Sequence, residues 1–164
     1  MIDRLAIIKG AVALFFAAVG ELLGWKGIML LVLALMMCVD YISGTLAAKR
    51  TGTWSSQKAR DGIFHKGGTL LVLLVAIVLD VLFSAAVPHL PFVSGTISNP
   101  GIFLPLVAAW YIITEIGSVM ENAVLMGAPV PAWFAKAVRA TGKIVDKAGE
   151  AAAPGTEGDD DEHT

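Results

Sequence analysis

Four long apolar blocks occupy most of this 164-residue chain and constrain its fold more than any other feature. They cover approximately residues 11–23, 27–48, 67–87 and 101–126. A helix needs about 20 apolar residues to cross a bilayer core, and the last three blocks reach this length. The first block is shorter and contains Glu21, so it either crosses the bilayer or lies at its surface.

Membrane helices explain these blocks better than a soluble core or a membrane barrel. The hydrophobic fraction is 56%, the charged fraction is 16% and the mean hydropathy is +0.73, which leaves little charge to cover a soluble domain. Because lipid offers the backbone no hydrogen-bond partner, spanning segments are helices or closed barrels. The stretch Leu70–Asp80 lacks the alternation of a barrel strand. We therefore predict an all-α membrane protein with three to four transmembrane helices in residues 1–130.

The chain after the fourth block divides into two parts. Residues 131–147 place Trp133, Phe134 and Ile144 on one helical face and four cations on another: Lys136, Arg139, Lys143 and Lys147. This pattern predicts a basic amphipathic helix that contacts an anionic inner leaflet, and the alternative is a tail helix packed on the protein. Residues 148–164 are small and acidic and are expected to form a disordered tail.

Lysine and arginine predict the orientation of the spans. The segment between the second and third blocks carries five of them: Lys49, Arg50, Lys58, Arg60 and Lys66. The segment at residues 88–100 carries none. We therefore expect the Lys49–Lys66 loop and the C-terminus to be cytoplasmic and residues 88–100 to lie outside.

Carboxylates inside the apolar blocks are the most informative polar residues. Asp40 lies in the second block, Asp80 in the third, and Glu115 and Glu121 in the fourth. A charge at the centre of a membrane helix costs roughly 2.5–3.5 kcal/mol on insertion scales. The sequence suggests no Lys, Arg or His at a matching depth. We therefore expect these groups to face other helices or water, either as hydrogen-bonded links between helices or as the lining of an aqueous path.

Small and polar residues around the carboxylates complete the candidate pore or helix-interface positions. Those that follow Asp40 on the second block are Ser43, Gly44, Ala47 and Ala48. Such small residues let membrane helices approach closely. Those on the fourth block share one arc of about 120° at 100° per residue: Tyr111, Thr114, Glu115, Ser118, Glu121 and Asn122. One polar stripe on an apolar helix favours contact with another helix or with an aqueous lumen.

No set of residues indicates an enzyme, a metal centre or a cofactor site. Asp40 follows Met-Cys-Val rather than the Gly-x-Gly element expected around an intramembrane aspartyl protease residue, and the three histidines lie in different regions. The single cysteine, Cys38, is expected to be a small buried apolar residue. Trp54 in the basic segment suits a membrane interface better than a nucleic acid. We expect no catalysis, no cofactor and no nucleic-acid partner.

An ordered set of short motifs resembles the phage-lysis and toxin-secretion holin family of small membrane proteins. In chain order it contains DYISG at Asp40–Gly44, Ala47-Ala48, Ser55-Ser56, Gly62, Lys66, Asp80, and EIGSVMENAVLMGAPVP with Glu115, Ser118, Glu121, Asn122, Gly127, Pro129 and Pro131. The resemblance covers about residues 24–131, and it explains neither the 88–100 segment nor the acidic tail.

The resemblance implies a protein that accumulates in the bacterial cytoplasmic membrane, associates with itself and opens lesions at a set time. An endolysin or a toxin then crosses, without a required direct contact with the holin. The family has no catalytic residues to carry over. Two other classes remain open: a small transporter or channel subunit, for which an internal repeat is expected but not found, and an antiholin-type regulator.

Overall fold

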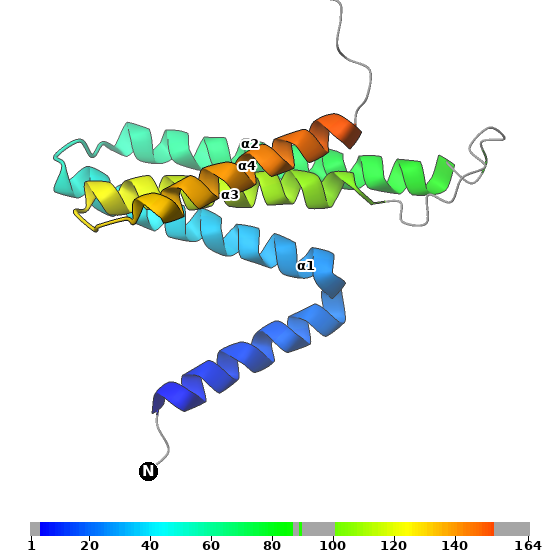
Figure 1. Ribbon diagram of the computed structural model, residues 1–164, viewed down its shortest axis with the longest axis horizontal. Helices are drawn as coiled ribbons and strands as arrows, with labels where there is room; N and C mark the ends of the chain where they lie inside the picture. Colours follow the sequence, from blue (N-terminus) through cyan, green and yellow to red (C-terminus); the bar gives the residue numbers. More distant parts are fainter. Residues whose placement is uncertain (1–3, 87–88, 90–100, 153–164) are drawn as a thin grey trace, which may run out of the picture.

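The computed structural model describes residues 4–86, 89 and 101–152. Four helices follow one another along the chain (Figure 1): α1 (Arg4–Arg50), α2 (Ser56–Ala86), α3 (Phe103–Leu125) and α4 (Ala132–Ala152). Within these described residues, three helical segments are long and apolar enough to cross a membrane: Gly24–Arg50 of α1, α2 and α3. The predicted all-α membrane protein with at least three such helices is therefore confirmed.

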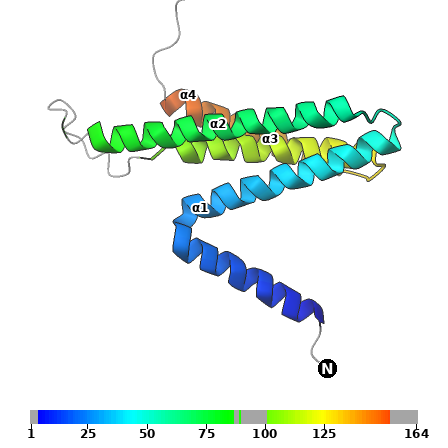
Figure 2. The same cartoon turned by 180° about the vertical axis from the view of Figure 1, so that it is seen from behind.

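A kink at Gly24 divides α1 into two parts. Gly24 has φ 65° and ψ −176°, a conformation that glycine adopts without the penalty of a Cβ atom. The chain before Gly24 turns away from the other helices, so the ribbon forms a V in both side views (Figures 1 and 2). The predicted first block lies in this arm, which is not among the three segments with the length and hydropathy of a span.

The start of α2 differs from the prediction. α2 begins at Ser56, well before the predicted third block at residue 67. The Ser55 hydroxyl accepts a hydrogen bond from the Lys58 backbone N–H at 3.2 Å and caps the helix start. The prediction that the whole basic segment forms a loop is wrong, because three of its cations lie in α2: Lys58, Arg60 and Lys66. Since α2 is longer than the roughly 20 residues that cross a bilayer core, its charged first turns can extend beyond that core.

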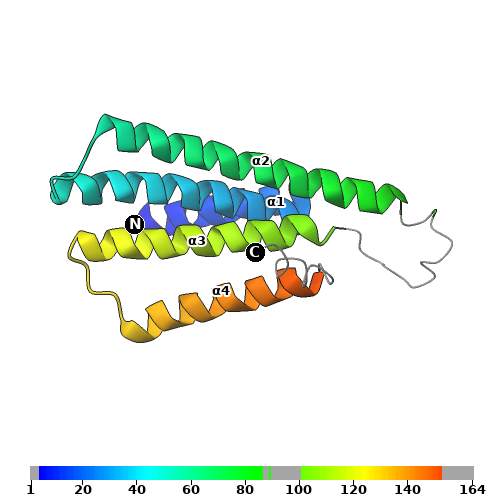
Figure 3. The ribbon, with the colours of Figure 1, turned by 90° about the horizontal axis from the view of Figure 1, so that it is seen from above.

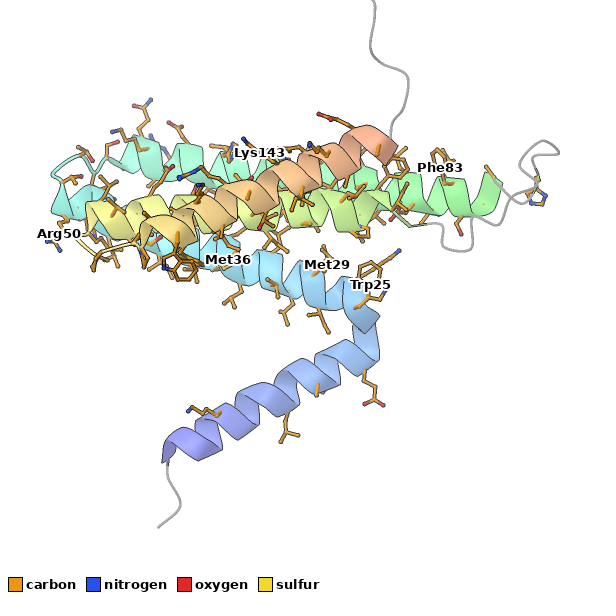
Figure 4. The ribbon with its side chains drawn as sticks, viewed as in Figure 1. Trp25, Met29, Met36, Arg50, Phe83 and Lys143 are labelled. Carbon is orange, nitrogen blue, oxygen red and sulfur yellow. The ribbon has the colours of Figure 1, made fainter. Side chains whose placement is uncertain are left out.

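α3 is the centre of the helical bundle, since it packs against α1, α2 and α4. Figure 3 shows α4 running beside α3 in the opposite direction. Arg50 and Phe83 mark the two ends of the bundle (Figure 4). The buried apolar core is small and comes from all three spanning helices: Leu33, Met37, Leu73, Leu104 and Ala108.

The outer surface of the bundle is apolar. Exposed large side chains follow α2 along its length, including Leu70, Leu71, Val75, Val78 and Leu82. A soluble monomer rarely exposes so large a patch, whereas lipid chains match it. Cys38 is also exposed, so the expectation that it is buried is wrong. An apolar exterior removes the need to bury that thiol.

The C-terminal helix is longer than expected. α4 runs to Ala152, beyond the predicted end at residue 147, so the first residues of the segment expected to be disordered are helical. The rest of the acidic tail lies outside the described residues. So does the predicted outer segment at residues 88–100, apart from His89.

Candidate functional site

Two carboxylates and one ammonium group join the three spanning helices at one depth. Lys66 Nζ of α2 lies 3.0 Å from Asp40 Oδ2 of α1, and 2.9 Å and 2.7 Å from Glu115 Oε1 and Oε2 of α3. Each of the three residues lies ten positions from the same end of the bundle, at Arg50, Ser56 or Leu125. At 1.5 Å per residue, this places the charge cluster about 15 Å from that end.

The charge cluster corrects one expectation from the sequence. The carboxylates were expected to have no basic group at matching depth, yet Lys66 contacts both Asp40 and Glu115. The physical reason is the early start of α2, which carries Lys66 well inside the helix. The side chains of Lys66 and Asp40 remain 16% and 21% exposed, and that of Glu115 only 9%. With all three groups ionised, the charge cluster carries one excess negative charge.

Asn122 extends the charge cluster along the contact between α1 and α3. Its Nδ2 donates to Asp40 Oδ1 and to Ser43 Oγ, both at 3.1 Å. The Ser43 hydroxyl donates to the Asp40 backbone carbonyl at 3.1 Å. A Cβ atom at Gly44 would lie 3.4 Å from Asn122 Nδ2, so the backbone of α1 passes close to this amide. Asp40 therefore has partners on both neighbouring helices.

A cavity of about 170 Å³ lies beside the charge cluster between α1 and α2. Asp40 and Lys66 line it, together with the small residues Gly44, Ala48 and Gly62. A water molecule occupies about 30 Å³ of liquid volume, so the cavity has room for several. Polar groups at its wall give such water hydrogen-bond partners. The charge cluster thus adjoins a space that can be hydrated while its opposite side packs on α3.

Asp80 belongs to a different site at the other end of the bundle. Its Oδ1 accepts from the Phe103 backbone N–H at 2.9 Å, and its Oδ2 accepts from the Leu104 N–H at 3.1 Å. The side chain of Ile102, the N-cap residue of α3, makes no capping hydrogen bond. The carboxylate from α2 therefore caps α3 in its place and complements the positive end of its helix dipole.

Lys26 completes the Asp80 site. Its Nζ lies 3.9 Å from Asp80 Oδ2, just after the α1 kink. Gly101 has φ 155°, and a Cβ atom there would clash with the Lys26 ammonium group. The expectation that Asp80 has no basic group at a matching depth is therefore also wrong, and no role was predicted for Lys26. The sequence signal that could have indicated this role is that Lys26 is a lone cation between the first two apolar blocks, at the end of the bundle where positive charges are otherwise scarce.

The other predicted interface residues do not act as one group. Ala47, Ala48 and Ser118 are buried or half-buried. Thr114 and Glu121 are exposed, and the Thr114 hydroxyl donates to the Trp110 carbonyl of its own helix at 3.0 Å. Glu121 instead lines a cavity between α3 and α4. The polar arc of α3 is therefore divided between the charge cluster at one edge and exposed positions toward α4 at the other.

The other cations of the predicted basic segment and those of α4 lie at the surface. Lys49 Nζ lies 5.8 Å from the centre of the Trp54 ring, and the Arg50 guanidinium lies beside Gly127 at the end of α3. The four cations of α4 are exposed: Lys136, Arg139, Lys143 and Lys147. α4 also forms a contact that the sequence did not reveal, in which the Trp110 indole N–H donates to Asp146 Oδ1 at 2.9 Å.

These observations define a small multi-span α-helical membrane protein whose deep charges are paired inside the bundle. The sequence model of the bacteriophage holin family matches residues 17–143, and the chain therefore belongs to this family. This confirms the resemblance seen in the motifs from Asp40 to Pro131.

Several uncharacterised bacterial proteins are similar to this chain. One from Halalkalibacterium halodurans is 31% identical over 133 residues, covering 81% of this chain and 92% of the relative. A 14.9 kDa protein in the nagH 3′ region of Clostridium perfringens is 31% identical over 67% of this chain and 74% of its own length. One from Listeria monocytogenes is 30% identical over 76% of this chain and 79% of its own length. No solved structure matches the chain.

Proposed function

We propose that this protein is a holin that associates with itself in the bacterial cytoplasmic membrane and opens lesions at a set time. An endolysin or a toxin then reaches the cell wall, and no direct contact with the holin is required. Family membership and the apolar exterior support this proposal. The distribution of Lys and Arg supports an orientation with the 51–55 turn in the cytoplasm, and with the C-terminus on the same side while α4 contacts the inner leaflet.

The observation that carries the proposal is the charge cluster of Asp40, Lys66 and Glu115, which joins three apolar helices. Removing one partner of a buried ion pair typically costs 3–5 kcal/mol, because the other charge stays buried and unpaired. Pairing therefore lets a single subunit remain in lipid without water at its centre. The charge cluster holds the closed, unassembled state together.

Assembly of many subunits changes this balance. Neighbouring copies replace lipid around the bundle, and the cavity beside Asp40 and Lys66 gives water a place to enter. Once hydrated, the excess carboxylate no longer depends on a shared ammonium group. Moving one charge across the membrane potential is worth about 2.3 kcal/mol per 100 mV, so loss of the potential shifts the closed-to-open balance of a cluster with an excess charge.

Before assembly, α4 lies away from α3 with its basic face on the inner leaflet, and it takes the docked position along α3 on assembly. Its four exposed cations match anionic headgroups, each worth about 1 kcal/mol near such a surface. This contact keeps the charged face of α4 out of the hydrocarbon before assembly. Release from the headgroups then becomes one step of the conversion to a lesion.

Induced expression in bacteria, with and without a co-expressed endolysin, tests the proposed function. We expect growth to stop abruptly and a small impermeant dye to enter the cells in both cultures, and turbidity to collapse only with the endolysin. An energy poison added before the normal onset should trigger the same events early. Continued growth with intact membranes, despite protein in the membrane fraction, would contradict the proposal and favour an antiholin or a scaffold.

A further inference from the structure

α4 turns one regular stripe of small residues toward α3. Within α4, the half-buried positions are Ala135, Val138, Gly142, Val145, Gly149 and Ala152, and the other positions are exposed. Their spacing alternates between three and four residues, which is the repeat of a helix packed along its partner. The stripe covers the length of α4, so α4 packs against α3 along its whole length and not only at one end.

The contact reaches the middle of the α3 span. A Cβ atom at Gly142 would lie 3.7 Å from Ile113 Cγ2, and Ile113 lies near the centre of α3. The bond from Trp110 to Asp146 lies further along in the same direction. α4 therefore runs back beside α3, as Figure 3 shows, rather than across the end of the bundle.

The charged residues of α4 form a second arc next to this stripe. At 100° per residue they fall within about 100° of one another: Lys136, Arg139, Lys143, Asp146, Lys147 and Glu150. Among the described residues, none of the four cations forms a salt bridge. The remaining arc carries Trp133, Ala140 and Ile144, and its one hydroxyl, that of Thr141, donates to the Ala137 carbonyl of the same helix at 3.0 Å. Because α4 lies at the depth of the α3 span, its charged arc needs water, whereas its small-residue stripe packs on α3 and its apolar arc needs none.

Acyl chains cannot surround the charged arc of α4, because several unpaired charges near the middle of a bilayer are strongly disfavoured. Lipid headgroups cannot contact the charged arc either while Gly142 stays beside Ile113, since α4 then lies at the depth of the α3 span. We propose that α4, docked along α3, lines the aqueous lumen of the assembled lesion with its basic arc. This inference rests on the proposed lesion formation, and it gives the lumen wall an excess of positive charge.

Conductance of the purified full-length protein in planar bilayers tests the lumen position. In a Cys38→Ser background, Lys143→Cys places a thiol in the charged arc, and Ala148→Cys places one on the apolar side of the same helix. We expect a bulky polyethylene glycol maleimide to lower the conductance of Lys143→Cys lesions and to leave Ala148→Cys lesions unchanged. Unchanged conductance of fully modified Lys143→Cys, or failure of the reagent to reach it in conducting lesions, would overturn the inference.

A second measurement tests the docking of α4 separately. Oxidation should join Ile113→Cys to Gly142→Cys in assembled protein, whereas the matched pair of Ile113→Cys and Lys143→Cys should stay apart. Absence of the first disulfide in conducting samples would show that α4 leaves α3 and would also overturn the inference. If the Cys38→Ser parent forms no conducting lesion under any condition, the proposed function itself fails, and the lumen assignment fails with it.

Discussion

Replacing Lys66 by methionine removes the ammonium group from the charge cluster and keeps a flexible chain of similar length. The change deletes three contacts of 3.0, 2.9 and 2.7 Å to Asp40 and Glu115. Breaking a buried pair typically costs 3–5 kcal/mol. The lower end applies here, because Asp40 keeps its bond to Asn122 and its side chain is 21% exposed. We therefore expect the closed state to lose about 3 kcal/mol.

At 1.4 kcal/mol per tenfold change, this loss lowers the closed-to-open ratio roughly 100-fold. We expect Lys66→Met to trigger lysis early when the onset is timed by culture turbidity after induction, at matched amounts of membrane-bound protein. The control is the neutral variant with Asp40→Asn, Lys66→Met and Glu115→Gln, which removes all charges together and should return the onset toward that of the wild type.

Two results would refute this reasoning. One is a wild-type onset for Lys66→Met at equal accumulation, which would show that the closed state does not depend on the charge cluster. The other is an equally early onset in the neutral triple variant, which would show that lost packing rather than unpaired charge is responsible.

Three further predictions follow from other contacts. Glu115→Gln leaves one carboxylate with Lys66, so the charge cluster becomes neutral and the onset of lysis should be delayed; an unchanged onset in both Glu115→Gln and Asp40→Asn would remove these carboxylates from the mechanism. Asp80→Ala deletes both capping bonds to the start of α3 and should lower stability to thermal unfolding in detergent by about 1–2 kcal/mol, whereas an unchanged midpoint would argue against the cap. Reversing the charge of the four α4 cations, Lys136, Arg139, Lys143 and Lys147, should change the onset of lysis. An unaffected onset would show that α4 is only a structural tail.

The sequence predicts the helices well because hydropathy alone limits where a chain can cross lipid. It also identifies Asp40 and Glu115, since a carboxylate in an apolar block is unfavourable without a partner. It does not identify Lys66 as that partner. The edge of an apolar block does not show where a helix begins, and Lys66 meets both carboxylates only when three helices adopt one particular rotation and depth.

The Asp80 and α4 contacts escaped prediction for similar reasons. The role of Asp80 as a cap requires the start of α3 to return to α2, which the sequence of the intervening segment does not specify. In α4, the charge pattern indicated an amphipathic helix on the inner leaflet, with packing on the protein as the alternative. The structure shows the packing, and the sequence did not identify α3 as the partner. A usable signal existed in the three-and-four spacing from Ala135 to Ala152, which matches helix packing better than a flat membrane surface.

Exchanging the charges of Asp40 and Lys66 tests the central claim most directly. Asp40→Lys alone leaves two ammonium groups with one carboxylate, and Lys66→Asp alone leaves three carboxylates with no ammonium group, so each should disturb the timing of lysis. If the two side chains meet in the closed subunit, the double exchange should restore most of the wild-type onset. A double variant no better than the worse single variant would show that the contact between α1 and α2 does not hold the protein closed.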